Sequence, residues 1–256
     1  MTTLSPTETA SVTELVTVAD AHGAQVQSMF DGIAHGYDRA NRWMSFGTDI
    51  RWRRKAVAGM LPVRCEPHAR LLDLCAGTLD STLEIHQQYP QADILAGDFS
   101  AGMLAHGARK LIGAAAQRIT TRQMDAHALP IADGSHDALF CAFGIRNLSE
   151  LEVATREQFR VLRPGGRLTI LEFFRPTAAI TRAVHALHNR TLLPLLGWAA
   201  TGKLGAYLYL PRSIGRFTTV ESYTELLRQT GFVDVQVERL TLGIAWVVRA
   251  SRPETT

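Results

Sequence analysis

Residues 69–82 (ARLLDLCAGTLDST) place the tightest constraint on how this chain can fold. Residues 69–75 form a short apolar run of the kind that predicts a buried strand. Residues 79–89 follow with apolar side chains at helical spacing, which predicts a helix. Ala76 and Gly77 stand between them and allow a tight turn without bulky side chains. The segment therefore predicts a strand, a small-residue turn and the start of a helix.

This turn is suited to an anionic ligand. Gly77 lets a ligand approach the backbone, and the free N–H groups of the helix start favour a group such as a carboxylate. Thr78 or Asp80 is available to cap the helix. The same geometry also occurs in turns that bind nothing, so a second feature is needed to choose between the two.

Asp98 is that second feature. Residues 92–97 (ADILAG) predict another strand, which leads into Asp98 about 20 residues after the glycine turn. A Rossmann-type fold places there the carboxylate that binds a ribose. The turn holds one glycine rather than the three of the dinucleotide fingerprint, which argues against a nicotinamide cofactor. A nucleoside that carries an amino acid fits better, and we predict S-adenosylmethionine (SAM) as the cofactor.

Strands and helices alternate along the rest of the chain. Further strands are expected at 119–124, 136–142, 167–173, 233–238 and 243–248, and helices at 101–112, 151–162 and 220–230. Residues 163–166 (RPGG) are expected to stop the helix before them. This alternation predicts an α/β fold with a seven-stranded, mostly parallel sheet and helices on both faces.

Two sections lie outside this alternation. The Thr/Ser-rich residues 1–11 are predicted to be a disordered leader, and 12–256 a single domain. Within that domain, residues 12–60 are expected as an N-terminal helical cap over the cofactor site. They contain a turn at 45–47 and then a basic, aromatic helix. Residues 174–217 are expected as a lid over the carboxyl ends of the strands, with an ordinary peripheral helix pair as the alternative.

Composition limits the partners and the location. A net charge of +3 is too small to indicate a nucleic-acid-binding protein. Basic residues cluster in one predicted helix, and a solvated helix face is the favoured interpretation: Arg51, Arg53, Arg54 and Lys55. No signal peptide is visible, and no apolar run reaches the roughly 18 residues needed to span a bilayer. We expect a cytoplasmic protein, at most peripheral to the inner face of the membrane.

The three cysteines, Cys65, Cys75 and Cys141, have neither metal-ligand nor redox-motif spacing. Two of them lie in predicted strands. We therefore expect reduced core residues, which is usual in the cytoplasm. No cluster of histidines and acids has the spacing of metal ligands, so no metal site is expected.

Four segments carry a resemblance to a known family: FDGIAHGYDRANRWMSFG (30–47), FGIRNL (143–148), RVLRPGGRLTILEF (160–173) and YLYLPRSI (207–214). The chain resembles the class I SAM-dependent methyltransferases that C-methylate quinone precursors in ubiquinone and menaquinone biosynthesis. RVLRPGG alone indicates only the superfamily, whereas the first two segments together point to the family. The resemblance runs from about residue 29 to residue 249. It implies a Rossmann-like class I methyltransferase fold.

The resemblance also implies cofactor contacts. Thr78 is similar to the family's threonine at the cofactor turn, and Asp98 to the carboxylate on the ribose hydroxyls. Asp125 and Ala126 resemble the pair beside the adenine ring, and Asp73 the acid directed towards the methionine amino group. Without the resemblance, Asp73 would be explained as a cap of backbone groups and Asp125 as a turn former.

Two positions depart from the family pattern. Leu79 stands where the family usually has a second glycine in the cofactor turn. Ala142 stands where it often has a serine, and alanine cannot donate that hydrogen bond. Both departures bear on cofactor affinity rather than on the fold.

Methylation of a ring carbon needs an electron-rich ring, and hence the loss of a proton from a neighbouring phenol. A phenol titrates near about 10, and a nearby cation shifts a pKa by roughly 1–3 units. Arg146 is the best candidate for this cation, because its guanidinium fork can hold a developing phenolate. The alternative is a structural arginine paired with an acid. Asn147 is a candidate to orient a water or the ring hydroxyl.

Tyr37 and Asn41 lie in the matched N-terminal segment and are candidates to close over the methyl group. Core packing is the competing interpretation of Tyr37. By chemistry alone the histidines at 35, 185 and 188 are candidate bases, but their spacing singles out none of them.

These features together predict a SAM-dependent C-methyltransferase that acts on a small aromatic substrate, a reduced quinone ring or a related phenol. One alternative is a tailoring enzyme that methylates carbon, oxygen or nitrogen of a soluble metabolite. Another is a non-catalytic partner that binds SAM or a quinone in a biosynthetic assembly. Reversible membrane contact through residues 192–198 (LLPLLGW) and 51–55, neither of which suffices alone, is a further hypothesis. A homodimer is another.

Overall fold

The computed structural model describes residues 28–29, 32, 37–39, 41–61, 68–177 and 204–254, without the side chains of 204–208. The predicted leader, most of the expected lid with residues 192–198, and the three candidate histidines lie outside this range.

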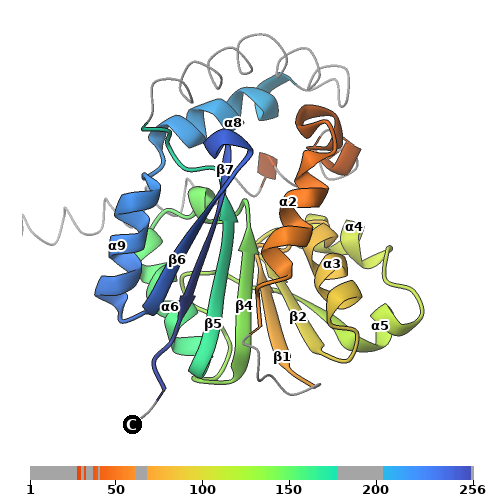
Figure 1. The fold of residues 1–256 in the computed structure, drawn as a ribbon. Coiled ribbons are helices and arrows are strands. Elements are labelled where there is room, and N and C mark those ends of the chain that lie inside the picture. Colours follow the sequence, from red (N-terminus) through yellow and green to blue (C-terminus); the bar gives the residue numbers. More distant parts are fainter. Residues whose placement is uncertain are drawn as a thin grey trace, which may run out of the picture.

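Seven strands form one sheet in the order β3-β2-β1-β4-β5-β7-β6 (Figure 1). The strands are β1 (Arg70–Leu74), β2 (Asp93–Asp98), β3 (Ile119–Gln123), β4 (His136–Ala142), β5 (Leu162–Glu172), β6 (Val233–Leu240) and β7 (Ala245–Ser251). Only β7 runs against its neighbours, β5 and β6. The predicted seven-stranded, mostly parallel sheet is confirmed.

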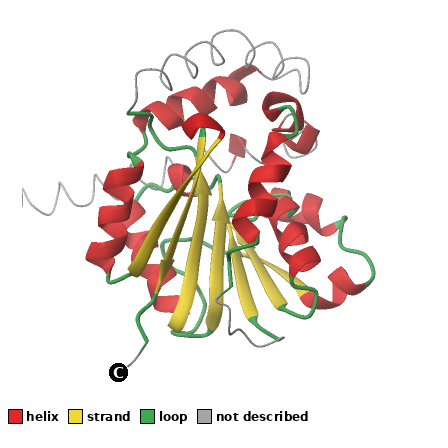
Figure 2. Ribbon diagram, viewed as in Figure 1, coloured by secondary structure: helices red, strands yellow, loops and turns green. Residues whose placement is uncertain are grey.

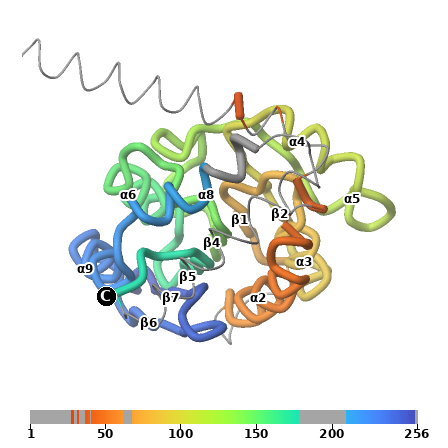
Figure 3. Tube along the Cα trace, turned by 90° about the horizontal axis from the view of Figure 1, so that it is seen from above, coloured from red at the N-terminus to blue at the C-terminus, as the bar shows by residue number. Residues whose placement is uncertain are grey.

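Helices cover both faces of this sheet, as the alternation of the sequence predicts (Figure 3). They are α2 (Thr48–Val57), α3 (Asp80–Gln88), α4 (Ala101–Ala108), α5 (Ala114–Arg118), α6 (Leu151–Val161), α8 (Leu204–Arg216) and α9 (Val220–Thr230), with short 3-10 turns η1 (Ile145–Asn147) and η2 (Thr241–Gly243). None of the helices in the described ranges combines the length and apolar character needed to cross a bilayer.

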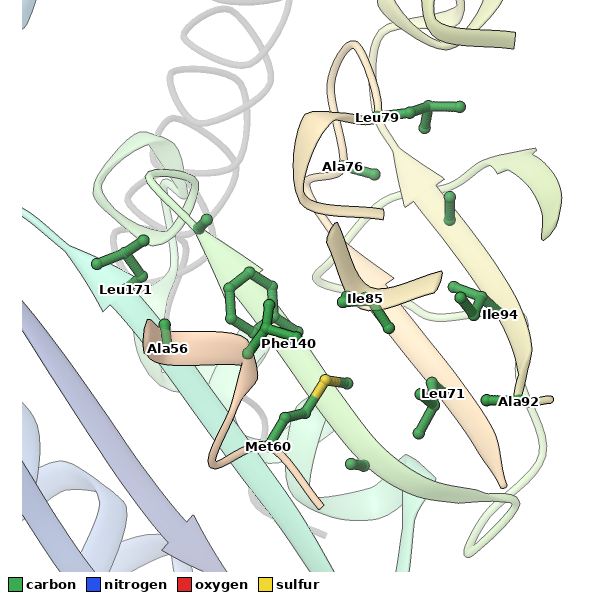
Figure 4. Packing of buried hydrophobic residues seen from close by; sticks show 14 of the residues in the cluster. Ala56, Met60, Leu71, Ala76, Leu79, Ile85, Ala92, Ile94, Phe140 and Leu171 are labelled. Carbon is green, nitrogen blue, oxygen red and sulfur yellow. The ribbon is translucent and has the colours of Figure 1, made fainter. Parts of the chain in front are cut away.

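Alternate residues of the central strands pack on opposite faces. Leu71 and Phe140 join α2 and α3 in one hydrophobic cluster (Figure 4). Leu72 and Leu139 join α6 and α9 in the other cluster. Such double coverage explains why these strands are apolar along their whole length, since a parallel sheet is buried on both sides.

The RPGG segment differs from its prediction. Helix α6 ends at Val161, and residues 163–166 already belong to β5. The pairing of β4 with β5 shifts between His136 and Ala138, and Gly165 adopts a φ of 75°. The two glycines thus form an irregularity inside the strand rather than a separate reversal. The short helix α5 was not predicted, and β7 lies two to three residues later than expected.

The loops that follow β1, β2, β4 and β5 gather at one edge of the sheet, where the arrowheads of β4 and β5 point (Figures 1 and 2). Helix α8 lies across this edge and contacts η1. Open parallel sheets bind ligands at this carboxyl edge, so this edge is where a ligand site is expected.

Candidate functional site

The turn after β1 alternates in and out of the left-handed region. Cys75, Gly77 and Leu79 have φ values of 58°, 54° and 67°. A Cβ placed on Gly77 would meet only the Met103 side chain, at 3.4 Å. The N-cap of α3 is Leu79, and no side chain caps the helix. The prediction that Thr78 or Asp80 caps it is therefore wrong. An uncapped helix start keeps backbone donors for a ligand, which fits an anion site.

Leu79 occupies a glycine-like conformation because its side chain is fully buried. A Cβ on Gly107 of α4 would lie 2.5 Å from Leu79 Cγ and 2.7 Å from the Thr78 carbonyl carbon. Gly107 thus provides the space that Leu79 fills. This chain has Leu79 where the family usually has a second glycine in the turn. The glycine that makes room for it, Gly107, lies on the neighbouring helix.

We expect Leu79→Gly to destabilise the protein although it relieves backbone strain. Removing a buried leucine side chain costs about 2–5 kcal/mol, whereas glycine adopts the left-handed conformation without the strain of about 1–2 kcal/mol that leucine carries there. Denaturant unfolding would measure the change. Leu242→Gly is the matched control, because Leu242 has a φ of 56° and is 78% exposed. An equal or higher stability of Leu79→Gly would contradict this packing argument.

Asp98 at the end of β2 faces the turn. Its Oδ2 accepts a hydrogen bond from the Gly77 N–H and its Oδ1 from the Ser100 N–H, both at 2.8 Å. Both bonds hold the carboxylate at the end of β2 beside the glycine turn, where a Rossmann-type fold places the acid that binds a ribose. The half-buried position next to Gly77 suits the role that the sequence predicts.

Asp73 is fully buried in β1. Its Oδ2 accepts from the Thr82 hydroxyl at 2.6 Å, while its Oδ1 has no hydrogen-bond partner among the residues that the structure describes. Burial raises the pKa of Asp73 to about 7, although the Thr82 hydrogen bond and Arg53 pull it down. An unsatisfied buried carboxylate oxygen is costly without a donor. The amino group that the resemblance assigns to Asp73 would be such a donor.

Thr78 is bound to the N-terminal segment. Its hydroxyl donates to Asp38 Oδ1. The Lys110 ammonium joins Asp38 Oδ2 at 2.5 Å, the Thr78 carbonyl at 2.8 Å and Asp80 Oδ1 at 2.8 Å. Arg42 completes the group through Asp80 Oδ2 at 2.9 Å. Asp38 and Arg42 thereby contact the cofactor turn and the start of α3, and the cap over the cofactor site stays a prediction.

Asp125 and Ala126 lie after β3. Asp125 Oδ1 accepts from the His127 backbone N–H at 2.9 Å and contacts His127 Nδ1 at 2.6 Å. The His127 ring in turn accepts from the Glu150 N–H at 3.2 Å. Ala126 is buried and Asp125 exposed. The turn-forming role of Asp125 is thus visible, and its role beside an adenine stays a prediction.

Arg146, in η1 after β4, is paired with an acid. Its Nη1 lies 2.7 Å from Glu172 Oε1 and 2.5 Å from the Phe143 carbonyl oxygen. Glu172 ends β5 and also accepts from the Phe173 N–H at 2.7 Å. The side chains are 6% and 0% exposed. The structural pairing that competes with the catalytic interpretation therefore exists.

The pairing leaves part of the arginine unused. Arg146 Nε is buried and donates to no acceptor in the described part of the chain. Burial opposes the charge of Arg146, yet the attraction of Glu172 and Tyr37 raises the pKa of the guanidinium. Burial likewise raises the pKa of Glu172, and Arg146 lowers it in part. A fixed guanidinium with a spare N–H can receive a further oxygen.

Two tyrosines approach this arginine from segments far apart in the sequence. The Tyr209 hydroxyl of α8 donates to Asn147 Oδ1 at 3.0 Å. Both Tyr37 and Tyr209 lie close enough to Arg146 to raise the pKa of its guanidinium. Asn147, Tyr37 and Arg146 are thus near one another, and their catalytic roles stay a prediction. Asn41 is half-buried, and no hydrogen bond joins it to this group in the residues that the structure describes.

An aromatic group borders the arginine. The rings of Phe143 and Phe173 stack with centroids 4.6 Å apart, and Trp52 of α2 packs on Phe173 at 5.8 Å. The Arg146 guanidinium lies 5.8 Å from the Phe173 ring centre. Planar apolar surface and a fixed cation therefore stand side by side, which suits an aromatic acceptor.

The model of the ubiE/COQ5 methyltransferase family matches residues 18–252. The chain belongs to this family. "Demethylmenaquinone methyltransferase" of Thermus thermophilus is 41% identical over 227 residues, covering 88% of this chain and 100% of the relative. "Ubiquinone/menaquinone biosynthesis C-methyltransferase UbiE" of Geobacter sulfurreducens is 39% identical, covering 88% of this chain and 87% of the relative.

Solved structures share the fold of this ubiE/COQ5 family member at low identity. The structure titled "Crystal Structure of the [4+2]-Cyclase SpnF" has a TM-score of 0.67 at 18% identity, covering 91% of this chain and 97% of that chain. This similarity supports the fold alone, because one fold hosts many chemistries.

Four residues of the site were not predicted as such: Glu172, Tyr209, Asp38 and Lys110. Glu172 and Tyr209 lie in segments that carry the family resemblance, so only their contacts were missing. Lys110 is far from any motif. Its role depends on the tertiary approach of α4 to the turn, which no local pattern reports.

Proposed function

We propose that this ubiE/COQ5 family member is a SAM-dependent C-methyltransferase that methylates a ring carbon of a reduced quinone. The observation that carries this proposal is the buried Arg146 with its spare Nε–H, held by Glu172 at the carboxyl edge beside the cofactor turn. The names of the relatives support the acceptor class.

The residues of the turn fit SAM. The Asp98 carboxylate stands beside Gly77, where it can bind ribose hydroxyls. The Asp73 oxygen that has no partner among the described residues suits an amino group, and the uncapped start of α3 beside Gly77 suits a carboxylate. Asp125 and Ala126 would border the adenine. When bound, SAM supplies an electrophilic methyl group on its sulfonium.

The protein's own contribution would be alignment and activation of the acceptor. Arg146 would bind the developing phenolate oxygen through Nε–H, while Glu172 keeps the guanidinium oriented. Asn147 and Tyr209 would hold the ring hydroxyl, and Phe143 and Phe173 would exclude water beside it. Tyr37 and Asn41, on the N-terminal cap, would close the site.

We expect the hydroquinone, and not the quinone, to be methylated. The oxidised ring is electron-poor and has no phenol to deprotonate. An anaerobic assay with dithionite-reduced and oxidised forms of one acceptor would follow the conversion of SAM to S-adenosylhomocysteine. Equal rates on both forms would contradict the phenolate mechanism. Preference for a short soluble phenol over a tailed quinol would favour the tailoring-enzyme alternative.

Reversible membrane contact is the finer part of the proposal. A tailed quinol resides in lipid, since burial of a chain is worth roughly 0.8 kcal/mol per CH₂. Trp43 and Phe46, next to α2, are 45% and 71% exposed. On α2 itself, the Arg54 and Lys55 side chains are 64% and 59% exposed. Exposed aromatic and basic side chains together suit an anionic lipid surface.

We therefore expect Phe46→Ser to reduce binding to anionic vesicles without affecting stability. Co-sedimentation with vesicles of anionic and of neutral lipid would measure the bound fraction. Ile112→Ser is the matched control, because Ile112 is 78% exposed but lies beyond α4. Equal loss of binding in both variants would contradict a specific surface.

A further inference from the structure

Two free cysteines lie side by side beneath the candidate site. Cys75 follows β1 directly, and Cys141 is the penultimate residue of β4. The Cys75 thiol is the neighbour that raises the pKa of Cys141 most strongly. A Cβ on Gly144 would lie 2.8 Å from Cys75 Sγ and 3.0 Å from Cys141 Sγ, so both sulfur atoms flank one point. The sequence spacing of these cysteines gives no indication of this contact.

The backbone explains why the sulfur atoms meet. Leu74 pairs with Cys141 in the parallel register of β1 and β4, so these two side chains share a face of the sheet. A regular strand would send Cys75 to the opposite face. Its φ of 58° ends the strand there instead, and Cys75 packs with the cluster that contains Cys141.

Neighbouring strands lie about 4.8 Å apart, and one step along a strand adds about 3.3 Å. The Cα separation this implies falls within the roughly 4.4–6.8 Å that a disulfide spans. Gly144 leaves room for both thiols, because any side chain there would meet Cys75 Cβ at 2.3 Å. The pair can therefore close by side-chain rotation with little movement of the backbone.

The two thiols differ in accessibility. Cys141 is fully buried, whereas Cys75 is partly exposed. The neighbouring Cys75 thiol and burial hold the pKa of Cys141 well above its ordinary value, and the nearby Glu172 and Asp73 add to this. Cys75 is thus the thiol that an oxidant reaches, and Cys141 the one that resolves the adduct.

We propose that Cys75 and Cys141 are a modification site, a thiol pair that a quinone oxidises to an intramolecular disulfide. The Cys75 thiolate adds to a quinone ring carbon, which gives an enolate adduct that has not yet become aromatic. The Cys141 sulfur then attacks the Cys75 sulfur. The sulfur–sulfur bond forms, the carbon–sulfur bond breaks, and its electron pair returns to the ring. Both thiol protons and two electrons leave with the hydroquinone.

Formation of the Cys75–Cys141 disulfide would affect both the cofactor turn and the loop that follows β4. Cys75 is followed by Ala76 and Gly77 of the cofactor turn, and Cys141 precedes the loop that carries Gly144 and Arg146. A disulfide would join the turn to this loop covalently. The choice of a quinone as oxidant rests on the proposed function, whereas the disulfide itself does not. Glutathione disulfide is the second oxidant class that the same thiol chemistry would accept.

The test uses the full-length reduced protein under anaerobic conditions. One portion receives a short-chain 1,4-naphthoquinone, another glutathione disulfide, and a third no oxidant. Intact mass and differential alkylation then report the state of each cysteine. Cys75→Ser and Cys141→Ser remove one member of the pair each, and Cys65→Ser is the matched control.

With the quinone, we expect wild type and Cys65→Ser to lose about 2 Da and to yield a Cys75–Cys141 peptide, reversed by dithiothreitol. Cys141→Ser should instead retain an arylated Cys75, because nothing resolves the adduct. Cys75→Ser should stay unmodified at Cys141. Two alkylatable thiols in oxidised wild type, or linkage through Cys65, would overturn the site. A disulfide with glutathione disulfide but not with the quinone would overturn the oxidant.

These readouts need no methylation, so their outcome does not depend on whether the proposed function is correct. A second measurement addresses the consequence of closure. The methylation rate of oxidised wild type on a hydroquinone should fall and return with dithiothreitol, whereas Cys141→Ser kept reduced should show no such dependence. An unchanged rate in a fully closed protein would overturn the coupling of the disulfide to the site.

Discussion

Asp98→Ala is expected to weaken SAM binding by about 10- to 100-fold or more. Each charge-assisted hydrogen bond to a ribose hydroxyl is worth roughly 1.5–3 kcal/mol, and about 1.4 kcal/mol corresponds to a tenfold change in affinity. The variant also removes the acceptor of the Gly77 and Ser100 N–H groups, which orders the turn for the ligand. Calorimetric titration with SAM would measure the loss.

Asp93→Ala is the matched control for this experiment. Asp93 begins the same strand, at the edge away from the site, and pairs with Arg118 at 2.9 Å. Its replacement should leave SAM affinity unchanged. Unchanged affinity in a folded Asp98→Ala variant would remove Asp98 from the cofactor site.

Arg146→Lys is expected to lower turnover by about 10²- to 10³-fold, the usual cost of losing one donor to a developing oxyanion. Lysine keeps the charge but lacks the planar fork that binds Glu172 through Nη1 and holds the Nε–H in a fixed second direction. SAM affinity should stay nearly normal, because Arg146 lies on the acceptor side. Single-turnover rates and the separate values of kcat and KM would report the change.

Arg163→Lys is the control for the arginine chemistry. Arg163 pairs with Asp137 at 2.7 Å at the opposite edge of the sheet. It should show a near-normal rate. If Arg146 serves only to pair with Glu172, its lysine variant should melt at a lower temperature and keep its rate per folded molecule.

The elements with a clear period were predictable from the sequence. β4 and α9 have the bounds that the pattern indicates, because a continuous apolar run and an amphipathic repeat each leave little choice. The RPGG segment was not predictable, since its helix-stop chemistry is also compatible with an irregular strand entry held by the shifted pairing to β4. Tertiary register decided between the two.

The site was predictable where it depends on local sequence and not where it depends on contacts. Gly77 and Asp98 follow from strand ends, and the structure places them in contact. Glu172 was seen only as the end of a strand, because its partner lies 26 residues earlier in the chain. The Cys75–Cys141 contact could not be predicted either, because it depends on the left-handed backbone conformation of Cys75, which no sequence pattern indicates.

The fit of Leu79 against Gly107 makes these two positions interdependent. A larger residue at 107 alone would collide with Leu79, and a glycine at 79 alone would leave a void. A glycine at 79 would remove only the first of two collisions that a side chain at 107 meets, because the Thr78 carbonyl carbon and oxygen lie 2.7 and 2.8 Å from the same point. The two positions share one contact, so the energies of changes at both would be non-additive. Redesign of the cofactor turn towards the family's usual glycine therefore has to treat α4 as part of the turn.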